Sequence, residues 1–128
     1  MLPDDASPTE WLRFAQSDLD TALGPPKGRI LLETLCFHAQ QAVEKSLKAI
    51  LAVRGVEFPR THNLRILMNL LPPDLSLPAD PICIGKLTDY AVSSRYPGVE
   101  EPVTEQEYHE AVRLAESVVK WAEDLIGV

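Results

Sequence analysis

The distribution of proline is the feature of this sequence that most limits its fold. The chain contains 11 prolines, and none of them falls within residues 27–58 or 103–128. Proline lacks the backbone N–H and clashes with the preceding helical turn, so it ends helices or stands in their first turn. The two proline-free stretches are therefore the places where long helices can form.

Apolar residues recur every three or four positions in both stretches, as expected for helices with one buried face. In the first stretch the period covers residues 28–54 and is followed by Gly55, a residue suited to a left-handed C-terminal cap. In the second it follows Thr104 and Glu107, which have the spacing of a capping box. Both patterns predict long amphipathic helices.

Three shorter helices are also predicted. Residues 7–10 (SPTE) combine a cap, a first-turn proline and a capping box, and they begin a helix that stops at a Gly-Pro-Pro turn. A small third helix covers residues 64–71, with Thr61 as its expected cap. A fourth begins at Asp80, just before a proline, and runs to about Ser94.

No stretch alternates apolar and polar residues as a half-buried strand would. The connections are short, so neighbouring helices are expected to run antiparallel. A chain of 128 residues can build one hydrophobic core but not two. We therefore predict an all-α, up-and-down bundle of four to five helices, a single domain over residues 1–128 with its core at about 8–126.

The net charge of −7 is unevenly distributed along the chain. Residues 45–65 carry a local charge of +4, whereas residues 100–128 carry −6. An acidic protein repels nucleic acid at long range, so coating of duplex DNA is not expected; a local basic patch can still bind one nucleotide or a few RNA phosphates. The same lysines equally suit a solvated helix face, with Glu44 and Lys48 as an i,i+4 pair.

Features that would place the chain in or across a membrane are missing from the sequence. No apolar run approaches the roughly 20 residues that span a bilayer, and the acidic N-terminus lacks the apolar core of a signal peptide. Cys36 and Cys83 lie in apolar periodic segments without a CxxC motif, as expected of buried free thiols. We therefore expect a cytoplasmic protein that does not associate with membranes.

Polar side chains that could bind an anion form a stripe on the helix predicted over residues 28–54. His38, Gln41, Lys45 and Lys48 are spaced by 3, 4 and 3 residues and would share one face, which could also be an ordinary polar helix surface. His62 stands at the start of the small third helix. There it could hold an anion with the help of free backbone N–H groups, or it could simply help to cap the turn.

Arg95 and Tyr96 stand near the end of the fourth predicted helix. An arginine beside an aromatic residue can pair with a phosphate and stack on a base, although Arg95 would equally suit the unpaired carbonyls of a helix C-terminus. His109, in the acidic last helix, is expected to face solvent. Because the sequence has no Gly-rich phosphate loop, HExxH or GxSxG motif, we predict no catalytic residue, no metal and no cofactor.

Several segments, taken in order, resemble the HEPN domain family. They are WLRFAQSDLDTA (11–22), FHAQQAVEKSLKAILAVRG (37–55), RTHNL (60–64), SRYPG (94–98) and TEQEYHEAVRLAESVVKWAEDLI (104–126). The resemblance covers about residues 8–126, and AQQAVEKSLKA is its most specific part. It implies an α-helical bundle that usually dimerises. It also implies a partner, because small stand-alone members are often encoded beside a minimal nucleotidyltransferase in toxin–antitoxin-like pairs.

Active members of this superfamily are metal-independent RNA endonucleases, with an arginine followed, after four to six residues, by a histidine. From Arg95 that histidine would stand at residues 100–102, which are Glu100, Glu101 and Pro102. No other arginine of the chain satisfies the spacing. The resemblance therefore implies a binding position at Arg95, and also at Tyr96, rather than nuclease activity.

Together these observations predict a non-catalytic HEPN-like domain that forms a homodimer and pairs with a minimal nucleotidyltransferase. The residues expected to bind nucleotide or RNA phosphates are His38, Gln41, Lys45, Lys48, His62, Arg95 and Tyr96. Two alternatives remain open. One is a metal-independent RNA endonuclease toxin in which His62 or His109 supplies the missing histidine. The other is a helical dimerisation or interaction module that binds no ligand.

Overall fold

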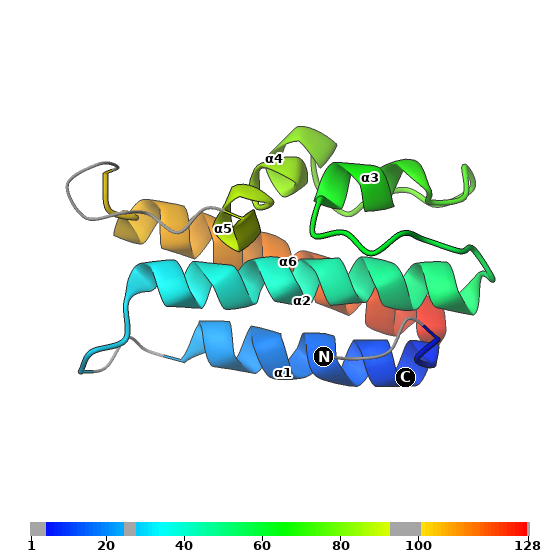
Figure 1. Ribbon diagram of the computed structural model, residues 1–128, viewed down its shortest axis with the longest axis horizontal. Coiled ribbons are helices and arrows are strands. Elements are labelled where there is room, and N and C mark those ends of the chain that lie inside the picture. The colour runs from blue at the N-terminus through cyan, green and yellow to red at the C-terminus, as the bar shows by residue number, and fades with distance from the viewer. Residues whose placement is uncertain (1–4, 25–27, 93–100, 128) are drawn as a thin grey trace.

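The computed structural model describes residues 5–24, 28–92 and 101–127 (Figure 1). Within these residues the chain is helical and contains no strand, which confirms the all-α prediction. The helices are α1 (Pro8–Leu23), α2 (Leu32–Val53), α3 (Leu64–Asn69), α4 (Pro81–Lys86), α5 (Asp89–Val92) and α6 (Glu105–Ile126).

The helices form an up-and-down bundle in which α3, α4 and α5 together take the place of one long helix. α1 and α2 run antiparallel along each other, and α6 packs against both (Figure 1). The three short helices lead the chain back along α2, so α6 starts beside the start of α2 (Figure 1). A hydrogen bond from the backbone N of Val103 to the Glu33 carboxylate, 3.2 Å long, joins these two helix starts.

Local signals set most of the helix ends. Capping boxes begin α1 at Ser7 and α6 at Thr104, and Asp80 caps α4. At the end of α2, Gly55 has a φ of +70° and its N–H bonds to the Ala52 carbonyl. The next N–H, that of Val56, reaches back to Leu51, which completes a Schellman motif of the kind that favours glycine.

Three helix boundaries differ from the predictions. α2 begins at Leu32 rather than 28, because Gly28 adopts a left-handed φ of +59° in the preceding turn. The side chain that caps α3 is Asn63, while Thr61 accepts a hydrogen bond from the Asn63 N–H just before the helix. α3 also ends at Asn69 rather than 71, and its last turn tightens into i→i−3 hydrogen bonds.

The predicted fourth helix is divided into α4 and α5. Between them the N–H groups of Leu87 and Thr88 bond three residues back, which tightens the turn. The Thr88 hydroxyl accepts a hydrogen bond from the Leu64 N–H of α3, 3.1 Å long. The break therefore lets the chain change direction between α4 and α5. It also places the Thr88 hydroxyl where it accepts a hydrogen bond from the first residue of α3. The part of the predicted helix after residue 92 lies outside the described residues.

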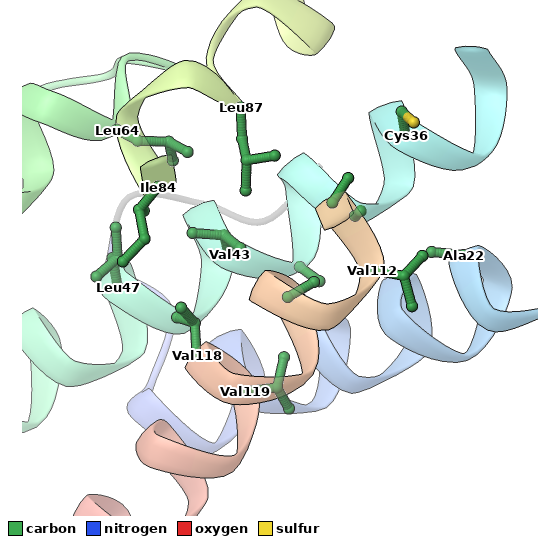
Figure 2. Close-up of a cluster of buried hydrophobic side chains, with 14 of the residues drawn as sticks. Ala22, Cys36, Val43, Leu47, Leu64, Ile84, Leu87, Val112, Val118 and Val119 are labelled. Atoms are coloured by element: carbon green, nitrogen blue, oxygen red, sulfur yellow. The ribbon is translucent and has the colours of Figure 1, made fainter. Parts of the chain in front are cut away.

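The core lies between α1, α2 and α6, and α3 and α4 cover its open side (Figure 2). Its largest buried side chains include Leu47, Val43 and Val118, with Leu64 and Ile84 from the short helices. α2 is the central helix, since 14 of its 22 residues are buried. Several polar side chains on α2 are therefore buried, and a buried polar group costs free energy unless it is hydrogen-bonded, as all of them except Ser46 are.

Both cysteines are free, as predicted, but only Cys36 is buried, while Cys83 is half-buried. Among the described residues no helix combines the length and apolar character needed to cross a membrane.

Candidate functional site: the polar face of α2

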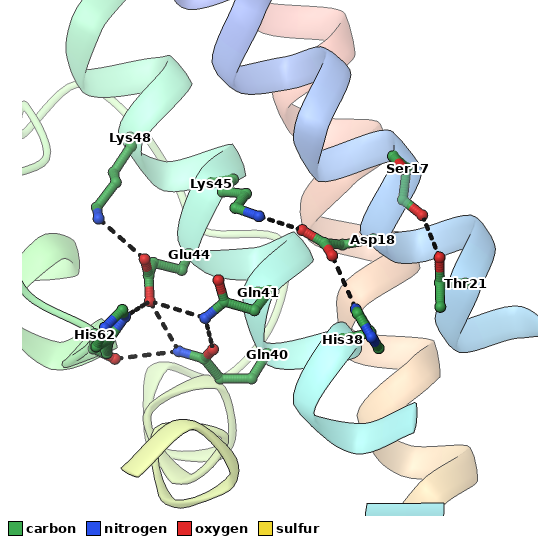
Figure 3. Close-up of polar contacts among 10 residues, drawn as sticks. All are labelled: Ser17, Asp18, Thr21, His38, Gln40, Gln41, Glu44, Lys45, Lys48 and His62. Carbon is green, nitrogen blue, oxygen red and sulfur yellow. Dashed lines mark hydrogen bonds and ion pairs between the residues drawn. The ribbon is translucent and has the colours of Figure 1, made fainter. Parts of the chain in front are cut away.

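Two carboxylates organise the polar side chains of α2 (Figure 3). One is Glu44 of α2 itself, and the other is Asp18, which α1 presents to α2. Each accepts a lysine on one oxygen and a histidine on the other. The predicted stripe is therefore divided into two neutralised groups of side chains.

The Glu44 cluster consists of Gln40, Gln41, Glu44, Lys48 and His62. Glu44 Oε2 accepts from Lys48 Nζ at 3.0 Å, and Oε1 lies 2.9 Å from His62 Nδ1. The amides of Gln40 and Gln41 also donate to Oε1, at 3.3 and 3.4 Å. Because the Glu44 side chain is only 3% exposed, these partners replace the water that the carboxylate loses on folding.

Lys48 is enclosed by aromatic rings as well as by its ion pair. Its ammonium lies 5.3 Å from the ring centroid of Trp11 in α1 and 5.9 Å from that of Phe58 in the loop after α2. Cation–π contacts of this kind strengthen as water is removed. With its side chain 10% exposed, Lys48 presents little surface to a ligand.

The Asp18 cluster consists of Asp18, His38 and Lys45. The Asp18 carboxylate lies 2.9 Å from His38 Nδ1 and 2.6 Å from Lys45 Nζ. Lys45 also lies over the Phe14 ring, 5.8 Å from its centroid. The His38 and Lys45 side chains are 30% and 20% exposed, so this cluster is more accessible than the buried Glu44 carboxylate and its lysine.

Both histidines turn Nδ1 toward a carboxylate. An ionised carboxylate can only accept hydrogen bonds, so Nδ1 carries the hydrogen and Nε2 is the atom left for another group. Nε2 accepts a hydrogen bond from a hydroxyl when the ring is neutral, and donates one to an anion when the ring is protonated. The His62 side chain is 54% exposed, which makes its imidazole the most accessible group of the face.

Three of the backbone N–H groups beside that histidine, expected to be free, already have hydrogen-bond partners. The backbone N–H groups of Asn63, Leu64 and Arg65 donate to side-chain oxygens of Thr61, Thr88 and Asn63, respectively. Caps use these donors before any anion can reach them. An anion at this point could not be bound by these three N–H groups.

The structure places five of the seven predicted site residues. His38 and Lys45 meet at Asp18, whereas Gln41, Lys48 and His62 meet at Glu44. Arg95 and Tyr96 lie outside the described residues. The predicted Glu44–Lys48 pair is present, and His109 is exposed as expected.

Sequence reasoning missed Asp18 and Gln40. Gln40 stands four residues before Glu44, a spacing that could have signalled its contact with the carboxylate. Asp18 is 27 residues from Lys45, and only the packing of α1 on α2 brings the two together. No group of three or more metal-ligating side chains is gathered within the described part of the chain.

Comparison with known proteins gives a consistent result. The family model described as HEPN domain matches residues 9–125. The crystal structure of TT1696 from Thermus thermophilus is 29% identical, with a TM-score of 0.75 over 92% of this chain and 97% of that one. The crystal structure of ST0689, an archaeal HEPN homologue, is 26% identical, with a TM-score of 0.69 over 94% and 98%. No curated protein matches the chain.

Proposed function

Since this chain belongs to the HEPN domain family, whose model spans residues 9–125, we propose that it is a cytoplasmic, non-catalytic domain that binds a nucleotide or a few RNA phosphates. We also propose that it forms a homodimer and pairs with a minimal nucleotidyltransferase in a toxin–antitoxin-like system. The family supports the dimer and the partner, and the polar face of α2 supports the ligand.

The observations that carry the ligand proposal are two carboxylate-held histidines, of which His38 shares Asp18 with the partly exposed Lys45 and His62 is held by Glu44. His38 and His62 each keep Nε2 for an outside group, and the ammonium of Lys45 has donors left after its bond to Asp18. Together these groups can contact phosphate oxygens and ribose hydroxyls. The nearby carboxylates oppose an anion, so we expect modest, salt-sensitive affinity.

The non-catalytic part of the proposal comes from the missing histidine after Arg95. The chain lacks the histidine that active members of the superfamily place at this spacing from the arginine, where a general acid or base would act on the 2′-hydroxyl or the leaving oxygen. We expect mixed tRNA and mRNA to stay intact when incubated with the protein without added metal. Cleavage that disappears in Arg95→Ala would contradict this and support an RNA endonuclease toxin that uses another histidine.

Binding is tested by titrating ATP and a short RNA at two salt concentrations. We expect Lys45→Ala, His62→Ala and Arg95→Ala each to lose about 1–3 kcal/mol of binding free energy, as for a lost hydrogen bond to a charged group. Lys120→Ala is the matched control, because Lys120 also pairs with a carboxylate but its side chain is 71% exposed. Variants that bind like the wild type would contradict the proposed site.

An interaction module without a ligand is the second candidate. The observation that favours it is the neutralisation of both stripe lysines by Glu44 and Asp18. In that case the polar face only holds α1, α2 and the loop after α2 together. The same titration separates the two functions, since the module predicts no salt-sensitive binding of ATP or RNA by the wild type.

A further inference from the structure

A groove of about 380 Å³ lies between the short helices α4 and α5 and the N-terminal half of α6. Its volume is within the range of sites that hold a small ligand or a few side chains. The apolar part of its lining consists of Leu87, Tyr90, Ala111 and Leu114. The half-buried thiol of Cys83 also lines the groove.

Charged side chains surround this apolar lining, and acidic ones predominate. Asp89, Glu107 and Glu110 contribute three carboxylates against the single ammonium of Lys86. Asp89 and Glu110 are exposed, and neither has an ion-pair or hydrogen-bond partner within the described parts of the chain. Glu107 is partly used by the capping box, where its Oε1 accepts from the Thr104 N–H at 3.0 Å.

We propose that this groove docks a short basic segment of a partner protein. A lysine or arginine of that segment faces Asp89 and Glu110, and a neighbouring apolar side chain covers Tyr90 and Leu114, which are half-buried, whereas Leu87 and Ala111 are already buried. The negative rim matches a cationic segment and repels nucleotides and RNA. The apolar lining favours a peptide over a small polyamine, because only a peptide brings apolar side chains next to its charges.

This surface is independent of the polar face of α2, since the two share no residue. The proposal can therefore fail without affecting the nucleotide or RNA proposal, and the reverse also holds.

The thiol in the groove provides a direct reporter. Cys36 is 0% exposed, so a polar thiol reagent added to the wild-type protein should modify Cys83 alone, as peptide mapping by mass spectrometry can verify. The labelling rate is measured with increasing amounts of the capped peptide KLKLK. Two control probes are used. The capped peptide ELELE carries the opposite charge, and spermidine carries positive charge without apolar side chains.

We expect KLKLK to slow the labelling of Cys83 about fivefold or more at saturation, and to do so less effectively at high salt. ELELE and spermidine should leave the rate unchanged. Failure of KLKLK to protect the thiol would overturn the proposal. Equal protection by spermidine would also overturn it and assign the groove to small cations.

Neutral variants test which carboxylates bind the peptide. Asp89→Asn and Glu110→Gln should each weaken KLKLK binding about two- to fivefold, the usual size for a rim charge. Glu116→Gln is the control, because Glu116 is an exposed carboxylate of α6 that does not line the groove. Equal affinity in all three variants would refute the charge match.

Discussion

Three lysines of this chain pair with carboxylates at very different degrees of burial. The Lys48–Glu44 pair is enclosed, the Lys45–Asp18 pair is half-enclosed, and the Lys120–Asp124 pair lies in solvent. A buried carboxylate that loses its partner keeps its desolvation cost, whereas solvent screens an exposed pair.

We therefore expect the cost of truncation to follow burial. Lys48→Ala should lower the free energy of unfolding by about 2–4 kcal/mol, somewhat softened because His62 and two glutamines still contact Glu44. Lys45→Ala should cost about 1 kcal/mol, and Lys120→Ala about 0.5 kcal/mol or less. Urea unfolding measures all three. Equal values for Lys48→Ala and Lys120→Ala would show that Glu44 does not depend on its lysine.

Ionisation of Tyr108 is expected to destabilise the folded chain at alkaline pH. Its hydroxyl donates to the Ala22 carbonyl at 2.6 Å in the interior, and burial, followed by the charge of the nearby Cys36 thiol, raises the pKa of the phenol above 10.0. The folded state holds this proton more tightly than the unfolded state does. The stability that this group contributes is therefore fully present below pH 10.0, and that contribution is lost as the pH rises through the pKa of the folded state.

Circular dichroism as a function of pH tests this limit. The wild type should lose stability above about pH 10, and Tyr108→Phe should lose less over the same range because the ionising hydroxyl is gone. At neutral pH the variant should be about 1–2 kcal/mol less stable, since the Ala22 carbonyl loses its donor. Parallel alkaline curves for the two proteins would assign the transition to other groups.

At the scale of the elements, the end of α2 depends on the backbone of one residue. Gly55 has a φ of +70°, where an L side chain is strained. Gly55→Ala should therefore destabilise the protein by about 1 kcal/mol, although nothing lies within 4 Å of the added methyl group. Gly127→Ala is the control: its φ is +86°, but it follows the last helix, where fraying relieves the strain. Thermal unfolding that affects both variants equally would contradict this account.

At the scale of the whole molecule, the exposed apolar side chains indicate where a second copy could bind. Four of the eight large apolar side chains that are exposed among the described residues stand close together in the sequence, at the end of α1 and the start of α2: Leu23, Ile30, Leu31 and Phe37. Monomers rarely expose such groups together, and a symmetric dimer would cover the same patch on both chains. HEPN proteins commonly form dimers, which is consistent with a second copy of this chain as the partner.

Light scattering should therefore give twice the chain mass of 14.2 kDa at micromolar concentration. Leu31→Glu and Phe37→Glu should shift the protein to a monomer, because each places a charge in the patch that the dimer would bury. Ile82→Glu, at a residue of α4 that is 65% exposed, should leave the dimer intact. A single-chain mass for the wild type at every concentration would exclude the dimer.

The helices of this chain can be predicted from its sequence, because the signals that begin and end them are local. Capping at Ser7 and Thr104, the glycine after α2 and the spacing of apolar residues all act within one or two turns. The same local rule found the Glu44–Lys48 pair, whose members are four residues apart. The local signals did not predict the break between α4 and α5. There the Thr88 hydroxyl accepts a hydrogen bond from α3, and the turn at Thr88 separates the two helices.

The burial and the ion pairs of the polar stripe on α2 depend on how the other helices pack against it. The sequence placed Lys45 and Lys48 on one face, but Asp18 reaches Lys45 from another helix, and Trp11 and Phe58 enclose Lys48. The same packing leaves His62 largely exposed while its partner Glu44 is buried. Burial and charge neutralisation depend on how helices far apart in the sequence pack together. The spacing of residues along one helix does not reveal which side chains of another helix will contact it.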